Sequence, residues 1–141
     1  MGPGPLRKTI PQIAMGNRQS TILVVDDNPT NLKLVKDVLG FEGHRILTAA
    51  DAKQAQEAVR ESLPDLILMD IGLPDMDGLT LTKKLKSETK TRHIIIVALT
   101  AFAMKGDEEK AIAAGCDGYV IKPIDTRKLP AFVAELLAHL V

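Results

Sequence analysis

Polar side chains that can do chemistry follow the short aliphatic runs of this sequence. The first run, Ile22–Val25, ends in two adjacent carboxylates, Asp26 and Asp27. Three later runs are followed by a carboxylate, a hydroxyl and an amine, respectively Asp70, Thr100 and Lys122. Adjacent carboxylates repel each other when they lose hydration, unless a cation lies between them. The set therefore indicates a site that binds a cation and an anion together.

This set of side chains suits phosphoryl transfer. Mg²⁺ prefers oxygen ligands, takes one or two carboxylates and keeps positions for phosphate oxygens. Such a cation would offset the repulsion between Asp26 and Asp27, and a lysine with a hydroxyl would hold the oxygens of a transferring phosphoryl group. A carboxylate can itself be the nucleophile and form an aspartyl phosphate. Asp70 is the candidate nucleophile because it stands alone after a central aliphatic run.

The elements that must position these residues alternate along the chain. Five aliphatic runs predict strands that are buried on both faces of a parallel sheet, at Ile22–Val25, Ile46–Ala49, Leu66–Met69, Ile94–Leu99 and Tyr119–Ile121. Amphipathic stretches between them predict five helices, which begin after Asn28 and Asp51 and near residues 78, 104 and 129. The alternation predicts an α/β fold with a doubly wound sheet. In such sheets ligands bind at the carboxyl ends of the strands, where all the polar residues above would lie.

The bulk composition excludes several classes of protein. The chain has 141 residues, the length of one domain, and its 18 basic residues balance 18 acidic ones. This balance gives no electrostatic footprint for nucleic acid or an anionic membrane, and no apolar run reaches the ~18 residues of a membrane span. The single cysteine, Cys116, cannot form an internal disulfide, which fits a reducing compartment. We therefore expect a cytoplasmic protein with no nucleic-acid or membrane partner.

Residues 1–20 differ from everything after them. They contain three prolines and three glycines and show no sustained periodicity. Such a composition predicts a flexible N-terminal tail or an expression leader. Residues 21–141 are then the folded domain.

At this point the sequence resembles a known family, the receiver domain of response regulators in two-component signalling. The resemblance is to the free-standing kind related to chemotaxis and cell-cycle regulators. It covers Thr21 to about Leu140 and depends on four motifs, which are VVDDN at 24–28, MDIGLPDMDG at 69–78, ALTA at 98–101 and YVIKP at 119–123. It implies a flavodoxin-like fold: a single five-stranded parallel sheet in the order 2-1-3-4-5 with five flanking helices.

Carried over by position, the resemblance implies a phosphorylation site. Asp70 would accept a phosphoryl group from a histidine kinase or a histidine phosphotransfer protein. Asp27, Asp70 and the Gly72 carbonyl would bind Mg²⁺ directly, and Asp26 would bind it through water. The domain would be a signalling switch, not an enzyme with turnover on other substrates.

The resemblance also implies how the switch works. Thr100 and Lys122 would hold the phosphoryl oxygens, and Tyr119 would move inward when Thr100 is drawn to the phosphate. The peptide bond between Lys122 and Pro123 would be cis.

A downstream protein would dock beside this switch. The docking surface of this chain would comprise the helix expected at about 104–114, the strand at 119–121 and the C-terminal helix. The first of these helices has only Met104, Ala111 and Ile112 as apolar anchors. We expect it to be weakly held, which suits an element that moves.

Two positions are expected to set the lifetime of the aspartyl phosphate. In this family the residues two beyond the phosphoacceptor and two beyond the threonine tune hydrolysis, and here they are Gly72 and Phe102. Glycine offers no side-chain hydrogen bond, and a phenyl ring excludes water instead of orienting it. The sequence therefore predicts slow self-dephosphorylation.

Two other features are not expected to bind metal. Asp75–Gly78 looks like part of a calcium loop, but the register places Leu73 and Lys84 at ligand positions. This stretch is instead predicted to be a turn into a helix. His44 and His93 have no partner at ligand spacing and are expected at the surface.

Other functions stay open at this stage. The sequence ends soon after the last helix without an effector segment, so the chain either works by docking alone or is a receiver domain cut from a hybrid histidine kinase. A flavodoxin-like electron carrier is less favoured, because Asp26–Pro29 would repel a flavin phosphate. A phosphohydrolase with an aspartyl-phosphate intermediate is disfavoured, because Asp70 is not followed by a second Asp two residues on.

Overall fold

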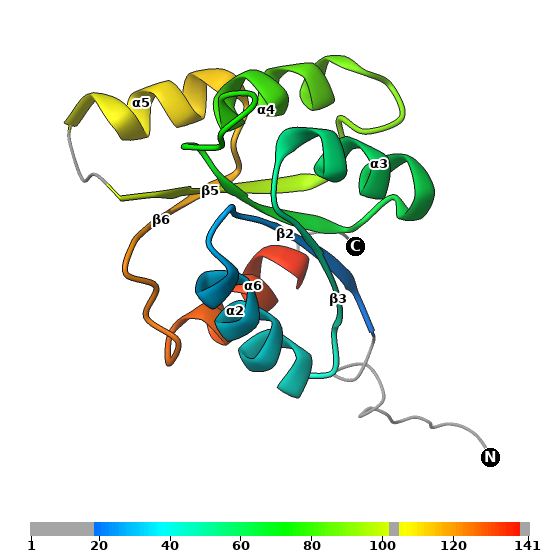
Figure 1. Ribbon diagram of the computed structural model, residues 1–141, viewed down its shortest axis with the longest axis vertical. Coiled ribbons are helices and arrows are strands. Elements are labelled where there is room, and N and C mark those ends of the chain that lie inside the picture. Colours follow the sequence, from blue (N-terminus) through cyan, green and yellow to red (C-terminus); the bar gives the residue numbers. More distant parts are fainter. Residues whose placement is uncertain (1–18, 102–104, 139–141) are drawn as a thin grey trace.

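Five parallel strands form one sheet in this protein (Figure 1). The computed structural model describes residues 19–101 and 105–138. The sheet has the order β3-β2-β4-β5-β6, with the strands at β2 (Thr21–Val25), β3 (Arg45–Ala49), β4 (Leu66–Asp70), β5 (Ile95–Thr100) and β6 (Gly118–Ile121). In chain order this is 2-1-3-4-5, which confirms the predicted doubly wound, flavodoxin-like sheet.

Five helices cover the two faces of the sheet. They are α2 (Pro29–Phe41), α3 (Ala52–Ser62), α4 (Gly78–Ser87), α5 (Lys105–Ala114) and α6 (Leu129–Ala138). Figure 1 shows α2 and α6 on one face and α3, α4 and α5 on the other. None of the described helices is long and apolar enough to cross a membrane.

The two faces of the central strands bury separate clusters of aliphatic side chains. In β2, Leu23 and Val25 pack toward α3 and α4, whereas Ile22 and Val24 pack toward α2 and α6. All four are inaccessible to solvent. A strand with two apolar faces is fixed in register by both layers. The carboxyl ends of β2 and β4, which are neighbours in the sheet, are therefore held side by side.

The predicted helix ends are confirmed. The Asn28 side chain accepts a hydrogen bond from the Thr30 N–H at the start of α2, and Asp51 accepts one from the Gln54 N–H at the start of α3. Asp77 caps α4, so the stretch that looks like a calcium loop is a turn into a helix, as expected.

The anchorage of α5 corrects one expectation. Ile112 is 63% exposed, whereas Ala111 and Ala114 are buried. Residues three apart share a face of a helix, and Ile112 lies about 100° around the axis from Ala111. Small alanines therefore hold α5, and Ile112 contributes little. Met104 lies outside the described residues.

Two other expectations have different outcomes. His93 is exposed as expected, but His44 is only partly exposed and its Nδ1 atom is buried without a hydrogen-bond partner. His44 precedes β3, and burial of its Nδ1 atom depends on packing that a polar residue type does not indicate. The tail predicted at residues 1–20 lies outside the described residues as far as residue 18.

Candidate functional site

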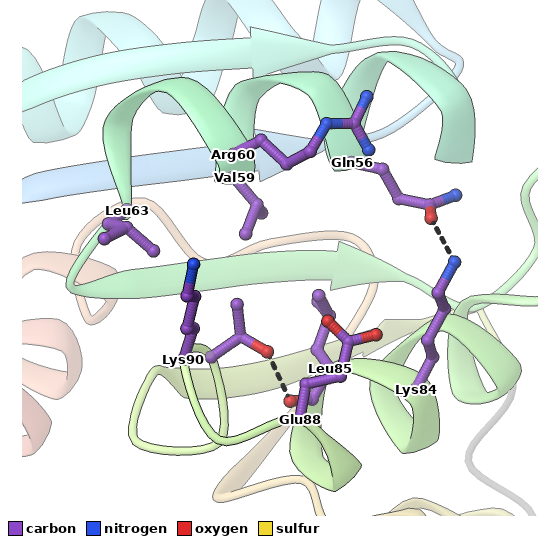
Figure 2. Close-up of a pocket in the computed structure, with 9 residues that line it drawn as sticks. Gln56, Val59, Arg60, Leu63, Lys84, Leu85, Glu88 and Lys90 are labelled. Atoms are coloured by element: carbon purple, nitrogen blue, oxygen red, sulfur yellow. Dashed lines mark hydrogen bonds between the residues drawn. The ribbon is translucent and has the colours of Figure 1, made fainter.

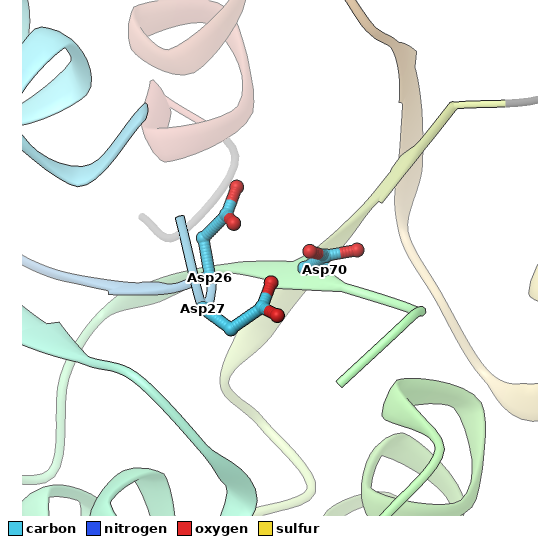
Figure 3. A group of neighbouring side chains, drawn as sticks. All are labelled: Asp26, Asp27 and Asp70. Carbon is cyan, nitrogen blue, oxygen red and sulfur yellow. The ribbon is translucent and has the colours of Figure 1, made fainter. Parts of the chain in front are cut away.

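Three carboxylates converge where β2 and β4 end. Asp26 and Asp27 follow the last residue of β2, and Asp70 is the last residue of β4 (Figure 3). One carboxylate oxygen of each lies within 4.8 Å of the others. Asp26 and Asp70 are buried, whereas Asp27 is exposed. The sequence predicted this cluster, and the parallel pairing of the two strands brings it together.

The buried carboxylate of Asp26 is fixed from several sides. Its Oδ1 accepts a hydrogen bond from the Asn28 N–H at 2.9 Å, and its Oδ2 accepts one from the Asn31 side-chain amide at 3.2 Å. The Lys122 ammonium lies 3.1 Å from the same Oδ2. These bonds offset the cost of burying a charge. Asp26 therefore has a fixed direction before any ligand binds.

Lys122 bridges two carboxylates of the cluster. Its Nζ lies 3.0 Å from Asp70 Oδ2 and 3.1 Å from Asp26 Oδ2. Partial burial by itself lowers the pKa of Lys122, but the hydrogen bonds to Asp70 and Asp26 outweigh that effect and raise the pKa above its ordinary value. The lysine is therefore charged at neutral pH. The Lys122–Pro123 peptide bond is cis, as predicted.

The two oxygens of Asp70 have different partners. Its Oδ1 accepts a hydrogen bond from the nearby Gly72 N–H, at 2.9 Å, while its Oδ2 is paired with Lys122. Gly72 is exposed. The carboxylate is thus held by one backbone group and one cation, at the mouth of the site.

Thr100 and Tyr119 lie on neighbouring strands, β5 and β6. Thr100 is almost fully buried at the end of β5, and its carbonyl accepts a hydrogen bond from the Lys122 N–H at 2.7 Å. Desolvation raises the pKa of Tyr119, and the carboxylates of Asp107 and Glu108 at the start of α5 raise it further. The tyrosine is therefore close to the first turn of α5. Phe102, the other expected tuning residue, lies outside the described residues.

Three positioning residues escaped the sequence analysis. Asn31 orients Asp26, as described above. Gly78 lies so close to the site that a Cβ atom there would be 2.3 Å from the Asp70 carbonyl oxygen. Asp75 accepts hydrogen bonds from the N–H groups of Ala52 and Lys53, which ties the loop after Asp70 to the start of α3. These bonds hold the pKa of Asp75 below its usual value. The DMDG motif at 75–78 contains both Asp75 and Gly78 and could have pointed to them.

The donor set of the cluster fits a hard divalent cation. Three carboxylates face one lysine, so the site has an excess of negative charge. All of the side-chain ligands offered are oxygen atoms, which Mg²⁺ prefers over nitrogen or sulfur.

The family follows from a comparison with known domains. A sequence model of the response regulator receiver domain matches residues 22–134. The chain belongs to this family. Receiver domains are the switch modules of two-component signalling, and they bind Mg²⁺ at an acidic cluster of this kind.

Individual relatives agree with the receiver assignment. The polar-differentiation response regulator DivK of Brucella anthropi is 42% identical over 120 residues, which cover 85% of this receiver chain and 95% of DivK. A CheY-like receiver domain protein from Methanospirillum hungatei JF-1 is similar in structure, with a TM-score of 0.80 and 30% identity over 87% of this chain and 97% of that one.

A second solved structure is informative about the metal. The receiver domain of the sensor histidine kinase PA1611 from Pseudomonas aeruginosa PAO1 has a TM-score of 0.78 and 33% identity, over 86% of this chain and 99% of that one. That protein has a magnesium ion coordinated in its active-site cleft.

Proposed function

We propose that Asp70 accepts a phosphoryl group from a histidine kinase or a histidine phosphotransfer protein. One observation carries the proposal: the Asp70 carboxylate lies in one cluster with Asp26, Asp27 and the Lys122 ammonium, which bridges Asp70 and Asp26. Asp26 and Asp27, with Asp70 and the Gly72 carbonyl, would hold Mg²⁺ beside the transferring phosphoryl group. The Lys122 ammonium would bind another oxygen of the same phosphoryl group. A phosphoryl group gains charge density on its oxygens during transfer, and this arrangement places positive charge where it is needed.

In the proposed step an oxygen of Asp70 attacks the phosphorus atom of a phosphohistidine. A P–O bond forms, the P–N bond breaks, and its electron pair stays on the departing imidazole. Bound Mg²⁺ would neutralise negative charge on the phosphoryl oxygens. Lys122 moves its hydrogen bond from Asp70 to a phosphoryl oxygen, and the Thr100 hydroxyl donates to another.

The substitution Asp70→Asn tests this proposal. An amide cannot form an acyl phosphate, so incubation with acetyl phosphate and Mg²⁺ should add one phosphoryl mass to the parent and none to the variant, measured on the intact protein. Asp37→Asn, which changes an exposed carboxylate on α2, is the matched control and should be phosphorylated like the parent. Equal labelling of Asp70→Asn and the parent would contradict the assignment.

We further propose that phosphorylation changes the surface formed by α5, β6 and α6, on which a downstream protein docks. A hollow of about 240 Å³ lies on this surface beside Tyr119, Ile124 and Phe132, and Ile121 is 45% exposed next to it. Inward movement of Tyr119 toward Thr100 would reshape this hollow. Beryllofluoride, a phosphoryl mimic, should therefore shift the amide resonances of β6 as well as those around Asp70. Shifts confined to the neighbours of Asp70 would contradict a switch at β6.

The lifetime of the phosphorylated state stays a prediction. Gly72 is exposed beside Asp70, and a Cβ atom built there would lie 3.7 Å from Asp70 Oδ1. Glycine has no side chain to orient an attacking water at this position. Loaded protein, freed of donor, should dephosphorylate slowly. The double variant Gly72→Asn with Phe102→Glu should lose the phosphoryl group several-fold faster. An unchanged rate would show that water exclusion does not set the lifetime.

The setting of the domain is also proposed. We propose that residues 21–141 form one receiver domain. We also propose that the protein is cytoplasmic, which the unpaired Cys116 supports. A response regulator and a receiver cut from a hybrid kinase would use the same chemistry at Asp70. The proposal therefore does not depend on which of the two holds.

A further inference from the structure

A groove of about 550 Å³ lies between α3 and the segment formed by α4 and the loop that follows it (Figure 2). Its apolar lining comes from Val59, Leu63 and Leu85. Val59 and Leu85 are buried, whereas Leu63 is half exposed. The groove follows both helices toward their C-terminal ends, so it extends away from the phosphoacceptor edge of the sheet.

The rim of the groove has an excess of positive charge. Arg60, Lys84 and Lys90 face only one carboxylate in the lining, that of Glu88. Among the residues that the structure describes, none of these three cations forms a salt bridge. Lys84 only donates a hydrogen bond to the neutral Gln56 side chain, at 2.7 Å. Because acidic and basic residues balance over the whole chain, the excess is a local feature of this surface.

Leu63 provides an independent sign that the groove has a use. It ends α3 with a left-handed backbone, φ 42° and ψ 71°. Helices usually end in this conformation at glycine, sometimes at asparagine, because a side chain there is strained. At this position the chain places a large apolar side chain that is also 50% exposed. Strained backbone clusters at functional sites, so the conformation of Leu63 at the edge of the groove supports a use for it.

We propose that this groove docks an acidic segment of a partner protein, in which one apolar side chain is flanked by carboxylates. The apolar side chain would lie on Val59, Leu63 and Leu85, and the carboxylates would pair with Arg60 and Lys90. The planar guanidinium of Arg60 suits a carboxylate in particular, because it donates two parallel hydrogen bonds. The proposal is independent of phosphoryl chemistry at Asp70.

Other occupants fit this groove less well. Single-stranded nucleic acid binds to aromatic side chains on which its bases stack, and the lining of the groove contains none. A second copy of the chain would have to supply the acidic segment itself, and on α2 the exposed Asp37 is already paired with Lys33.

The first test measures binding of a short fluorescent peptide made of Glu and Ser around one central Leu, by anisotropy at low salt. Arg60→Glu with Lys90→Glu should weaken binding by about tenfold or more, since the double variant replaces two attractions by two repulsions. The matched control, Lys36→Glu with Lys110→Glu, makes the same change of charge on exposed residues of α2 and α5 and should bind like the parent. Replacing Glu by Lys in the peptide, or its Leu by Ala, should also weaken binding.

Leu63→Gly separates docking from a structural role. Glycine relieves the left-handed backbone, so this variant should unfold at the same or a higher urea concentration than the parent, yet bind the peptide more weakly. Undetectable binding of the acidic peptide by the parent, or equal loss in the α2 and α5 control, would overturn the proposal. So would an oligonucleotide complex or self-association that the Arg60 and Lys90 substitutions abolish while peptide binding is absent.

Discussion

Two lysine–aspartate clusters lie at opposite ends of the sheet and differ in charge balance. Lys122 contacts Asp26 and Asp70 at the carboxyl ends of the strands, and Lys86 contacts Asp117 near the start of β5. The side chains of both lysines are 19% exposed. The two lysines are therefore matched in type and burial, and their partners make the difference: the side chain of Asp117 is 41% exposed, against 1% for Asp26 and 9% for Asp70.

The cluster around Lys86 is complete in itself. Its ammonium lies 2.8 Å from Asp117 Oδ2, and it donates to the carbonyls of Ile94 at 2.7 Å and Arg92 at 3.2 Å. The same Asp117 oxygen accepts the Ile96 N–H. One positive charge meets one negative charge, and three acceptors surround the three donors of the ammonium. This cluster joins α4, β5 and the turn before β6.

The cluster around Lys122 is incomplete. Three carboxylates within reach of one another face a single ammonium, which leaves an excess of negative charge for a cation to neutralise. The comparison teaches that two lysines of equal burial can differ in role, and that the balance of charge around each one separates a structural ion pair from a binding site in this fold.

The largest expected effect concerns the backbone behind the Lys122 cluster. In Gly78→Ala the new Cβ would lie 2.3 Å from the Asp70 carbonyl oxygen and 2.8 Å from Ile71 Cα. We expect a loss of about 3 kcal/mol in the free energy of unfolding, measured with urea, because overpacked sites must shift backbone. Gly72→Ala is the control, since its nearest contact would be 3.7 Å, and should change stability by no more than about 1 kcal/mol. Equal losses in both variants would contradict the account.

Removing each lysine should separate the clusters by their response to metal. Lys86→Met removes the donor to Asp117 and to two backbone carbonyls. We therefore expect the free energy of unfolding to fall by about 2 kcal/mol, and Mg²⁺ should not restore it. Lys122→Met should lose a similar amount in EDTA and recover with added Mg²⁺, because the cation replaces the lost positive charge. Thermal unfolding of both variants with and without Mg²⁺ is the measurement. Recovery of Lys86→Met by Mg²⁺ would break the comparison.

The same substitution should have opposite signs at the two clusters. Asp27→Asn removes one of three mutually repelling carboxylates, so in EDTA it should stabilise the fold by about 1 kcal/mol, the size of a contact between two charges in water. It should also reduce the stabilisation by Mg²⁺. Asp117→Asn removes a charge that has its partner in Lys86, and should destabilise the fold with or without metal. A loss of stability for Asp27→Asn in EDTA would show that the cluster has no excess charge.

The smallest expected effect lies outside both clusters, at His44. Burial lowers the pKa of His44 below its ordinary value of 6.5, and Glu42 only partly offsets this. The unfolded chain therefore binds the proton more readily, so stability falls as the pH drops from about 6.5 toward the lower folded pKa. His44→Leu should remove this part of the pH dependence, measured by urea unfolding between about pH 5 and 8. His93→Leu, at an exposed site, is the control and should keep the pH dependence of the parent.

Much of the fold and the phosphorylation site could be predicted from the sequence, because each signal is local. The aliphatic runs give the strands, Asn28 and Asp51 mark helix starts, and parallel pairing then gathers the residues that follow the strands. The chemistry at Asp70 follows because carboxylates bind a divalent cation, and a lysine with a hydroxyl binds phosphoryl oxygens.

The remainder depends on contacts between segments far apart in the sequence. Asp75 binds the start of α3, and Lys86 reaches Asp117 across 31 positions. No periodicity or spacing encodes such pairs. For the same reason Ile112 was wrongly expected to anchor α5: the side of the helix that meets the sheet is set by packing, and the side chain is 63% exposed.

The most direct measurement is to locate the phosphoryl group itself. The protein is incubated with acetyl phosphate and Mg²⁺ and then treated with borohydride, which reduces an aspartyl phosphate to homoserine. Peptide mass spectrometry then reads the modified position. The account predicts homoserine at Asp70 and, in a parallel sample with EDTA, none. Homoserine at Asp26 or Asp27, or a phosphoryl group on His93 with Asp70 unmodified, would contradict it.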